Sequence, residues 1–522
     1  MRYWKGFSYL IVLMFALTLV GCGSGSDGAS SGENGGKSTS EKADDGILTI
    51  ANGADMVTFD TQDHLTTSTW SVHLNMFDYL VQRDENGEYQ PSAAESWENI
   101  SDNEWEFVLR DDITFHNGDP VTANDVKFTL ERVAKDEALL QHYLFQQIKE
   151  VNVVDDHTFR IVTDGPAPAL FNTLALMGSE ILPSKYIEEN GMDHFLQNPI
   201  GSGPYKFVEW KKDDRITLER NDEYWAYEPE WEQVVFRVVP EDSTRTGELL
   251  TGGVDVALNV SPNDWERVDG NNGTYISQNE TTRVMQLVLR TAGDHATVDP
   301  RVREAIELAI DKQGIVDGII NGAGTITRSA VTPTAFGGHE GLYGDDIYDP
   351  ERAKELLKEA GYEDGLELTF SIPNGRYLKD KEVGETIQSM LAEVGITANL
   401  DVLEWSKWIE KYNGKTFPEI YMSGYANEIL DAKDPLGMME SEKTKGETDY
   451  NNPEYDELLE KAIRNMNPEE RVEQYERAQE IIAEERPRIF LYAVKMVSGV
   501  SDHLDFNPEG ELIYADRVTP KN

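Results

Sequence analysis

The chain has 522 residues, of which 39% are hydrophobic and 10% aromatic, and its 96 acidic residues outnumber 47 lysines and arginines. This length exceeds one ordinary hydrophobic core, so we expect a globular protein with two or three lobes. The net charge of −49 argues against nucleic acid and anionic lipid as partners, because the protein would repel both.

The N-terminus has the pattern of a secretory signal. Arg2 and Lys5 precede an apolar stretch, residues 7–20, that is too short to span a bilayer. The stretch leads into Leu19-Val20-Gly21-Cys22, which resembles the bacterial lipobox and contains the chain's only cysteine. We therefore expect residues 1–21 to be a signal peptide and Cys22 to become the acylated first residue. The alternative is a buried free cysteine.

Two consequences follow from that prediction. The protein would be lipid-anchored at the outer face of the cytoplasmic membrane, because two or more acyl chains anchor stably. Loss of residues 1–21 would remove two basic residues and no acid, which changes the net charge from −49 to −51. Residues 22–45 contain almost no apolar side chain and are predicted to be a flexible tether.

Folded structure is predicted to begin near Gly46, with a strand-rich first half and a second half that alternates strands and helices. The predicted strands are 46–51, 105–110, 158–163, 205–210, 215–219, 234–239, 284–289, 366–371 and 396–402. Helices are predicted to begin after Asp299, Asp349, Asn452 and Asn467, each followed by proline, with another helix over 385–394. This alternation indicates an α/β lobe with helices packed on its sheet.

Several short blocks of residues occur in the order in which a known family carries them. They are 58–60 (TFD), 75–80 (NMFDYL), 91–97 (PSAAESW), 107–110 (FVLR), 115–118 (FHNG), 122–126 (TANDV), 201–205 (GSGPY), 220–225 (RNDEYW), 299–303 (DPRVR) and 309–312 (AIDK). With these blocks, the chain resembles the solute-binding proteins of ABC transporters in the peptide and nickel class, family 5, from about Gly46 to the C-terminus.

The resemblance implies an α/β fold with two lobes, the Venus-flytrap type of periplasmic binding proteins, in which ligand is enclosed between the lobes. Lobe I would comprise residues 46–285, with an extra subdomain inserted at about 81–196. Lobe II would comprise residues 286–488, and residues 489–522 would return to lobe I.

Arg376 is the first candidate for a ligand contact. It follows the predicted strand 366–371, at the strand end where open α/β sheets place ligands, and a guanidinium can hold a carboxylate with two charge-assisted bonds. The alternatives are an exposed loop arginine or an arginine in an interlobe salt bridge.

The resemblance suggests further ligand contacts. Peptide binders of this family carry an aromatic residue, and soon after it an acid for the ligand's ammonium group, where this chain has Tyr425, Asn427 and Asp431. Asn427 stands about where the acid would be, with Glu428 and Asp431 nearby, which departs from the family's pattern. The remaining candidates for the cleft wall are Trp70, Arg290 and Trp405.

Enzymatic and metal-binding motifs are absent from the sequence, including H-E-x-x-H, the P-loop and the nucleophile elbow. We therefore expect no enzyme activity, no cofactor and no protein-only metal site. The leading hypothesis is an extracytoplasmic receptor, monomeric, that captures a short peptide and delivers it to an ABC permease driven by a cytoplasmic ATPase. An oligosaccharide or a chelated metal remains open as ligand. The competing classes are a lipid-anchored secreted hydrolase and a chaperone or adhesin on the same fold.

Overall fold

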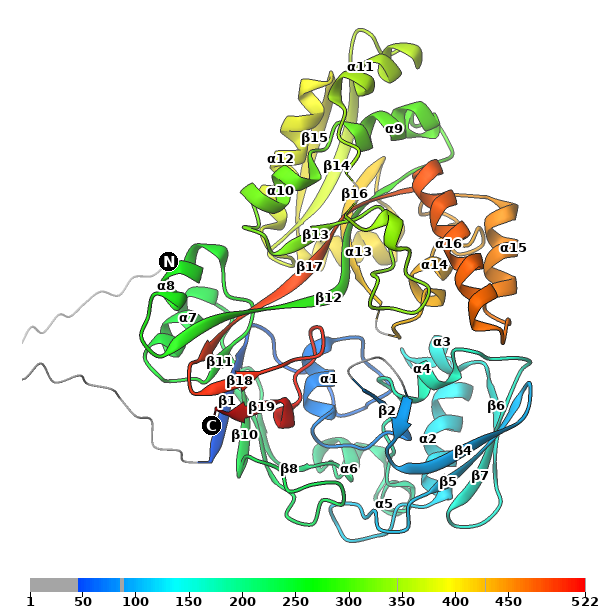
Figure 1. Ribbon diagram of the computed structural model, residues 1–522, viewed down its shortest axis with the longest axis vertical. Helices are drawn as coiled ribbons and strands as arrows, with labels where there is room; N and C mark the ends of the chain where they lie inside the picture. Colours follow the sequence, from blue (N-terminus) through cyan, green and yellow to red (C-terminus); the bar gives the residue numbers. More distant parts are fainter. Residues whose placement is uncertain (1–45, 85–88, 345, 428, 522) are drawn as a thin grey trace, which may run out of the picture. The chain divides into compact units, whose positions relative to one another are not determined.

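The computed structural model describes residues 46–84, 89–344, 346–427 and 429–521 (Figure 1). The predicted signal peptide, the tether and Cys22 lie outside these residues, and so does Glu428. The strands are β1 (Ile47–Asn52), β2 (Val81–Arg83), β3 (Tyr89–Pro91), β4 (Ala94–Ser101), β5 (Glu104–Leu109), β6 (Ile148–Val153), β7 (Thr158–Thr163), β8 (Tyr205–Lys211), β9 (Arg215–Arg220), β10 (Gln233–Val238), β11 (Val256–Ala257), β12 (Thr274–Leu289), β13 (Gly324–Ile326), β14 (Leu366–Asn374), β15 (Ile396–Glu404), β16 (Ile420–Ala426), β17 (Arg488–Ser501), β18 (Leu504–Phe506) and β19 (Val518–Pro520).

Helices connect most of these strands. The α-helices are α1 (Thr67–His73), α2 (Ala123–Lys135), α3 (His142–Phe145), α4 (Leu170–Leu174), α5 (Ser184–Asn190), α6 (Met192–Gln197), α7 (Asp242–Leu250), α8 (Trp265–Asp269), α9 (Pro300–Leu308), α10 (Lys312–Gly318), α11 (Pro350–Glu359), α12 (Asp380–Glu393), α13 (Trp405–Asn413), α14 (Lys433–Gly437), α15 (Pro453–Ala462) and α16 (Pro468–Glu485).

A mixed sheet of eleven strands organises the described residues. Its order is β15-β14-β16-β12-β17-β11-β1-β10-β9-β8, and β13 pairs with β17 beside this path. β14 runs parallel to β15 and β16, and β1 runs parallel to β10 and β11. A separate antiparallel sheet, in the order β4-β5-β7-β6, lies within the predicted insertion of residues 81–196.

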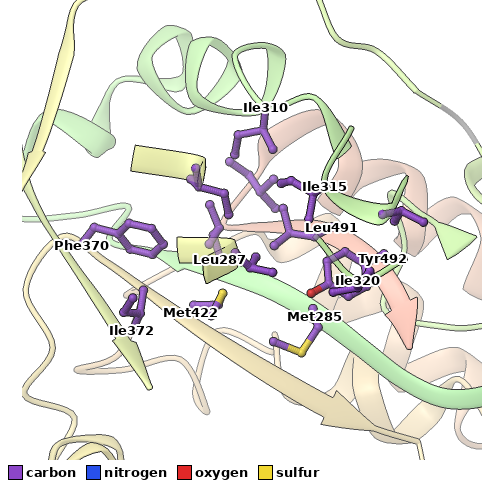
Figure 2. Close-up of a cluster of buried hydrophobic side chains, with 14 of the residues drawn as sticks. Met285, Leu287, Ile310, Ile315, Ile320, Phe370, Ile372, Met422, Leu491 and Tyr492 are labelled. Atoms are coloured by element: carbon purple, nitrogen blue, oxygen red, sulfur yellow. The ribbon is translucent and has the colours of Figure 1, made fainter. Parts of the chain in front are cut away.

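The second-half strands bury both of their faces, because successive side chains point to opposite sides of a sheet. Figure 2 shows Leu287, Met422 and Leu491, from β12, β16 and β17, in one buried cluster that also contains residues of α9 to α12. Val288, the next residue on β12, packs on the other side with Trp408 of α13. The sheet therefore carries helices on both faces, as the alternating pattern predicts.

Four predicted helix starts are confirmed. In each, a side-chain oxygen before the proline accepts a hydrogen bond from a backbone N–H of the first turn, which satisfies a donor that the helix itself leaves unpaired. The four capping residues are Asp299 on α9, Asp349 on α11, Asn452 on α15 and Asn467 on α16.

The pair of β12 and β17 is the longest ladder of the sheet and carries two irregularities. The register shifts between Glu280 and Val284 and again between Met285 and Gln286. Such bulges bend a strand and increase its local twist. The hydrophobic pattern predicts this strand only at 284–289, because the preceding residues, Thr274–Arg283, are too polar for such a pattern to reveal a strand.

The turn at residues 201–204 packs tightly against another segment. A Cβ atom on Gly201 would lie 1.9 Å from the carbonyl oxygen of Met76, and one on Gly203 would lie 2.6 Å from the Met76 carbonyl carbon. The backbone N–H of Gly203 donates to that same carbonyl oxygen at 2.9 Å. Only glycine permits this approach, which accounts for the two glycines of this turn.

The C-terminal segment returns to the first half of the chain. The indole of Trp231 donates to the carbonyl of Val518 at 2.7 Å, and the backbone N–H of Ile513 donates to the Ser71 hydroxyl of α1 at 3.3 Å. The segment after β18 thus lies beside α1 (Figure 1). The predicted lobe boundaries themselves stay a prediction.

Candidate functional site

A cavity of about 1050 Å³ is lined by residues from distant parts of the chain. The lining residues lie in the segments 67–84, 91–92, 110, 172–176, 204, 224–227, 280–282, 333–334, 426–427, 429–430 and 507–517. Residues 280–282 belong to the bulged part of β12, so the irregular ladder directly shapes the wall. Aromatic side chains are prominent in the wall: Trp70, Phe77, Tyr79, Tyr224, Trp225, Tyr227 and Tyr514.

Asp78 forms one polar part of this wall. Its carboxylate accepts hydrogen bonds from the Tyr224 hydroxyl at 3.0 Å and the Trp225 indole at 3.2 Å. Burial raises the pKa of Asp78 to about 6, although these hydrogen bonds oppose the shift. The guanidinium of Arg110 lies 4.5 Å from the centre of the Trp225 ring, which places a cation on the aromatic face.

A chain of hydrogen bonds leads from the cavity into the protein interior. The indole of Trp70 donates to the Tyr79 hydroxyl at 2.8 Å, and that hydroxyl donates to the carboxyl group of Glu180 at 2.8 Å. The backbone N–H of Gly178 donates to the other oxygen of Glu180 at 2.6 Å. Burial raises the pKa of Glu180 to about 8, so this carboxyl group is largely protonated at neutral pH.

An ion pair joins β12 to the C-terminal segment. Arg283 donates to both carboxylate oxygens of Glu511, from Nε at 2.7 Å and from Nη2 at 2.9 Å. Burial raises the pKa of Glu511, but the charge of Arg283 and its hydrogen bonds outweigh this effect and leave the pKa lowered. Glu511 lines the cavity and is ionised there.

Two of the residues predicted to contact ligand line the cavity, namely Trp70 on α1 and Asn427 after β16. Both are buried. Asn427 accepts a hydrogen bond from the backbone N–H of Asp431 at 3.4 Å, while its Nδ2 atom is buried without a hydrogen-bond partner among the described residues.

Arg376 and Trp405 lie outside the lining residues, side by side. The guanidinium of Arg376 lies 5.4 Å from the centre of the Trp405 ring and 5.1 Å from that of Tyr377. Arg376 is exposed, as expected for a residue just after β14. The surrounding protein nevertheless partly desolvates the guanidinium, and this desolvation, followed by the charge of Arg283, lowers the pKa of Arg376.

The other predicted contacts are engaged with protein groups and also lie outside the lining. Asp431 is fully buried and accepts from Arg471 at 2.6 Å. The Tyr425 hydroxyl donates to Asp434 at 2.8 Å. Arg290 pairs with Asp449 at 3.0 Å and donates to backbone carbonyls of the 415–418 segment.

Several residues of this wall are missing from the contacts predicted by sequence. Tyr224 and Trp225 belong to the block 220–225, and they donate hydrogen bonds to Asp78 while also lining the cavity. Nothing in the local pattern around Glu511 signals a site, because its role depends on a partner 228 residues away.

Among the described residues, no helix combines the length and the apolar composition that crossing a membrane requires. The same part of the chain contains no group of three or more His, Cys, Asp or Glu side chains placed to hold a metal ion.

Comparison with known proteins places these features in a family. The model of "Bacterial extracellular solute-binding proteins, family 5 Middle" matches residues 88–447. The chain is 26% identical over 487 residues to Di/tripeptide-binding protein 1 of Pseudomonas aeruginosa, covering 85% of this chain and 86% of that protein. It is 29% identical over 436 residues to Heme-binding protein A of Haemophilus influenzae, covering 77% and 78% of the two chains.

The fold has a close structural counterpart. The ABC transporter-associated periplasmic binding protein DppA of Helicobacter pylori, solved with the peptide STSA, matches with a TM-score of 0.77 and 26% identity over 91% of this chain and 98% of that one. This match confirms the predicted α/β fold of the two-lobe periplasmic-binding-protein type. Since the family model covers most of the folded chain and its members bind solutes rather than transform them, this chain belongs to the bacterial extracellular solute-binding proteins of family 5.

Proposed function

We propose that this protein is the lipid-anchored receptor of an ABC importer, which captures a short peptide in the cavity described above and delivers it to a permease driven by a cytoplasmic ATPase. The observation that carries the proposal is the 1050 Å³ cavity, whose wall combines residues from the beginning, the middle and the end of the chain. A site assembled in this way closes around a solute when those parts approach one another.

A short peptide suits the chemistry of the wall. The cavity volume is at the upper end of the range of about 300–1,000 Å³ typical of small-molecule sites. Its aromatic side chains can pack against peptide planes and side chains, while its carboxylates and guanidiniums can bind polar ends. Relatives named for di- and tripeptides, and a structural counterpart solved with a tetrapeptide, support this choice of ligand.

Arg376 is proposed to bind the carboxylate of that peptide. Arg283 and Glu511 both lie close enough to influence the pKa of Arg376. Glu511 and Asp380 offset part of the positive charge of Arg283 and Arg376, and a ligand carboxylate would add the two parallel hydrogen bonds that suit a guanidinium. The guanidinium is exposed, and the rings of Tyr377 and Trp405 hold it by cation–π contacts, which leaves its edge available for hydrogen bonds.

The anchor is part of the same proposal. Cys22 would carry the lipid, and residues 22–45 would tether the folded part to the outer face of the cytoplasmic membrane. Cys22→Ser should move the protein from the membrane fraction to the soluble fraction without altering its thermal melting. A mutant that stays on membranes with unchanged electrophoretic mobility would contradict the anchor.

Calorimetry tests the ligand class directly. The mature protein is titrated with trialanine and with the same peptide carrying an acetylated N-terminus, and native mass spectrometry examines gently purified protein for retained solute. Binding of at least one peptide, together with a more compact, closed form in scattering, supports the proposal. Failure of both peptides, together with a retained sugar or metal complex, would contradict it.

A further inference from the structure

One polar group of the cavity wall lacks a hydrogen-bond partner. Asn427 is fully buried and lines the cavity, and its Nδ2 atom has no partner among the described residues. The Oδ1 atom accepts from the backbone N–H of Asp431, which fixes which end of the amide is the carbonyl. A buried donor without an acceptor destabilises the protein, so a ligand that supplies an acceptor to this donor gains affinity.

The turn that carries Asn427 is held in place from several sides. Asp431 binds Arg471 at 2.6 Å and the Tyr475 hydroxyl at 3.2 Å. The amide of Asn172, itself a lining residue, donates to the carbonyl of Ile429 at 2.8 Å. Because these contacts fix the backbone after Asn427 and the pairing of β16 with β12 fixes it before, the Asn427 amide is preorganised rather than free to find another partner.

The described carboxylates on this turn already accept hydrogen bonds from other protein groups. Asp431 is bound to Arg471 and Tyr475, and Asp434 accepts from the Tyr425 hydroxyl. On the neighbouring strand β12, Arg283, which is paired with Glu511, lies in register with Ala426, the residue before Asn427. Both described carboxylates on this turn are therefore engaged with donors of the protein.

We propose that Asn427 is a specificity-determining residue whose Nδ2 group donates a hydrogen bond to an oxygen of the ligand, and that the site accordingly selects peptides with an acyl oxygen at this position over peptides with a free ammonium group. This inference rests on the proposed peptide-binding function. An ammonium group has three donors and no acceptor, so it would meet the Asn427 donor in a desolvated contact that neither group can satisfy.

The test compares two probes on five proteins. The probes are trialanine and N-acetyl-trialanine, and the proteins are the wild type, Asn427→Asp, Asn427→Ala, Glu428→Gln and the control Asn507→Asp. Asn507 is an exposed residue of the same cavity wall, so its substitution adds the same charge without touching the turn. Calorimetry at pH 7 gives the dissociation constants.

The wild type should bind the acetylated peptide about tenfold or more tightly than the free one. Asn427→Asp should reverse this preference, whereas Asn507→Asp should shift both affinities by a similar, small factor. Asn427→Ala should weaken binding of the acetylated peptide by about five- to tenfold and should leave binding of the free peptide unchanged or slightly stronger, because the donor that opposes its ammonium group is gone. The unliganded Asn427→Ala protein should melt close to the wild type, because the substitution removes an unpaired donor together with the acceptor of one long hydrogen bond, that from the Asp431 N–H at 3.4 Å.

Three results would overturn the inference while the proposed function stands. One is equal binding of both probes by the wild type and Asn427→Asp. Another is an equal loss of both probes in Asn427→Ala together with lower thermal stability, which would make the residue structural. The third is a wild-type preference for free trialanine that disappears in Glu428→Gln, which would assign ammonium recognition to that acid. If neither probe binds the wild type, the proposed function fails and this inference fails with it.

Discussion

Arg283 and Glu511, 228 residues apart in the chain, form a bidentate ion pair that joins the C-terminal segment to the bulged part of β12. Their side chains are 12% and 25% exposed, so neither charge is fully hydrated. The pair lies at the cavity wall, beside the candidate carboxylate contact Arg376. A single ion pair thus contributes both to the attachment of the C-terminal segment and to the charge of the site.

Glu511→Gln should lower the free energy of unfolding by about 1–3 kcal/mol, because it removes the negative charge that the partly buried guanidinium of Arg283 binds through two hydrogen bonds. The matched control is Glu509→Gln in the same segment, whose partner is Arg517. Both of those side chains are 34% exposed, so the control should change stability by less than about 1 kcal/mol. Urea unfolding at pH 7 measures both variants. Equal effects would show that burial does not distinguish the two pairs.

Glu180 should make the folded protein less stable as the pH rises. Its pKa is about 8 in the folded state, against 4.5 in the absence of burial, so the folded state binds the proton more tightly. The contribution of Glu180 to the free energy of unfolding is fully present below pH 4.5. It is lost as the pH rises toward 8, and the total loss is on the order of 3–5 kcal/mol. Glu180→Gln should therefore be more stable than the parent at pH 8.5, and this advantage should be smaller at pH 5.

Chemical denaturation at several pH values measures this effect, and Glu189→Gln on the exposed side of α5 is the control for loss of a carboxylate. A glutamine at position 180 can still accept from the Gly178 N–H and donate to the Tyr79 oxygen. An unchanged pH dependence in Glu180→Gln would exclude burial of this carboxyl group as its source.

His64 should make the folded protein less stable as the pH falls, which is opposite to the effect of Glu180. Burial lowers its pKa from 6.5 to about 4, and burial also places the pKa of the neighbouring His73 well below its usual range. The unfolded chain therefore binds more protons, so stability is complete above pH 6.5 and falls as the pH decreases toward 4. The loss from His64 reaches about 2 kcal/mol at pH 5. The free energy of unfolding of His64→Gln should therefore decrease less than that of the parent as the pH falls below 6.5.

The exposed His503 provides the matched control, since His503→Gln removes an imidazole in contact with solvent. Unfolding is followed at pH 5.0, 5.8, 6.6 and 7.4, a range in which the effect of Glu180 has the opposite sign. A slope that is the same in His64→Gln and the parent would contradict the prediction.

Arg376→Ala should weaken binding of trialanine by about 1.5–3 kcal/mol, the contribution of a hydrogen bond to a charged group. Arg376→Lys should recover only part of the loss, because an ammonium cannot form the two parallel bonds of a guanidinium. The unliganded variant should lose less than about 1 kcal/mol of stability, since the contacts of Arg376 with Tyr377 and Trp405 are exposed cation–π contacts.

Trialanine with an amidated C-terminus is the control ligand for this experiment, because it lacks the carboxylate. Its affinity should be the same for the parent and Arg376→Ala in calorimetry. If Arg376→Ala changes the affinities for both ligands equally, or changes neither, Arg376 does not bind the carboxylate and is an exposed loop residue.

Local patterns in the sequence determine much of the fold. Asp299, Asp349, Asn452 and Asn467 cap their helices as predicted, since a cap requires only a side-chain oxygen and a backbone N–H two or three residues away. The apolar residues at 366–371 and 396–402 place β14 and β15 for a similar reason, because the faces of a sheet follow from residues two apart, whereas β16 and β17 are missing from the predicted strands. The position of Arg376 after β14 follows from the same pattern.

Only the tertiary structure decides which polar residues meet at the cavity. Asp431 is a candidate ligand contact by sequence, but a salt bridge to Arg471, 40 residues further on, holds it inside the protein. Glu511 carries no local signal, yet the return of the C-terminal segment brings it to Arg283. Asn427 follows β16 in the structure, and the lack of a partner for its Nδ2 group among the described residues depends on every element packed around it. Contacts of this kind arise from chain topology and packing, which act over sequence separations that no local pattern records.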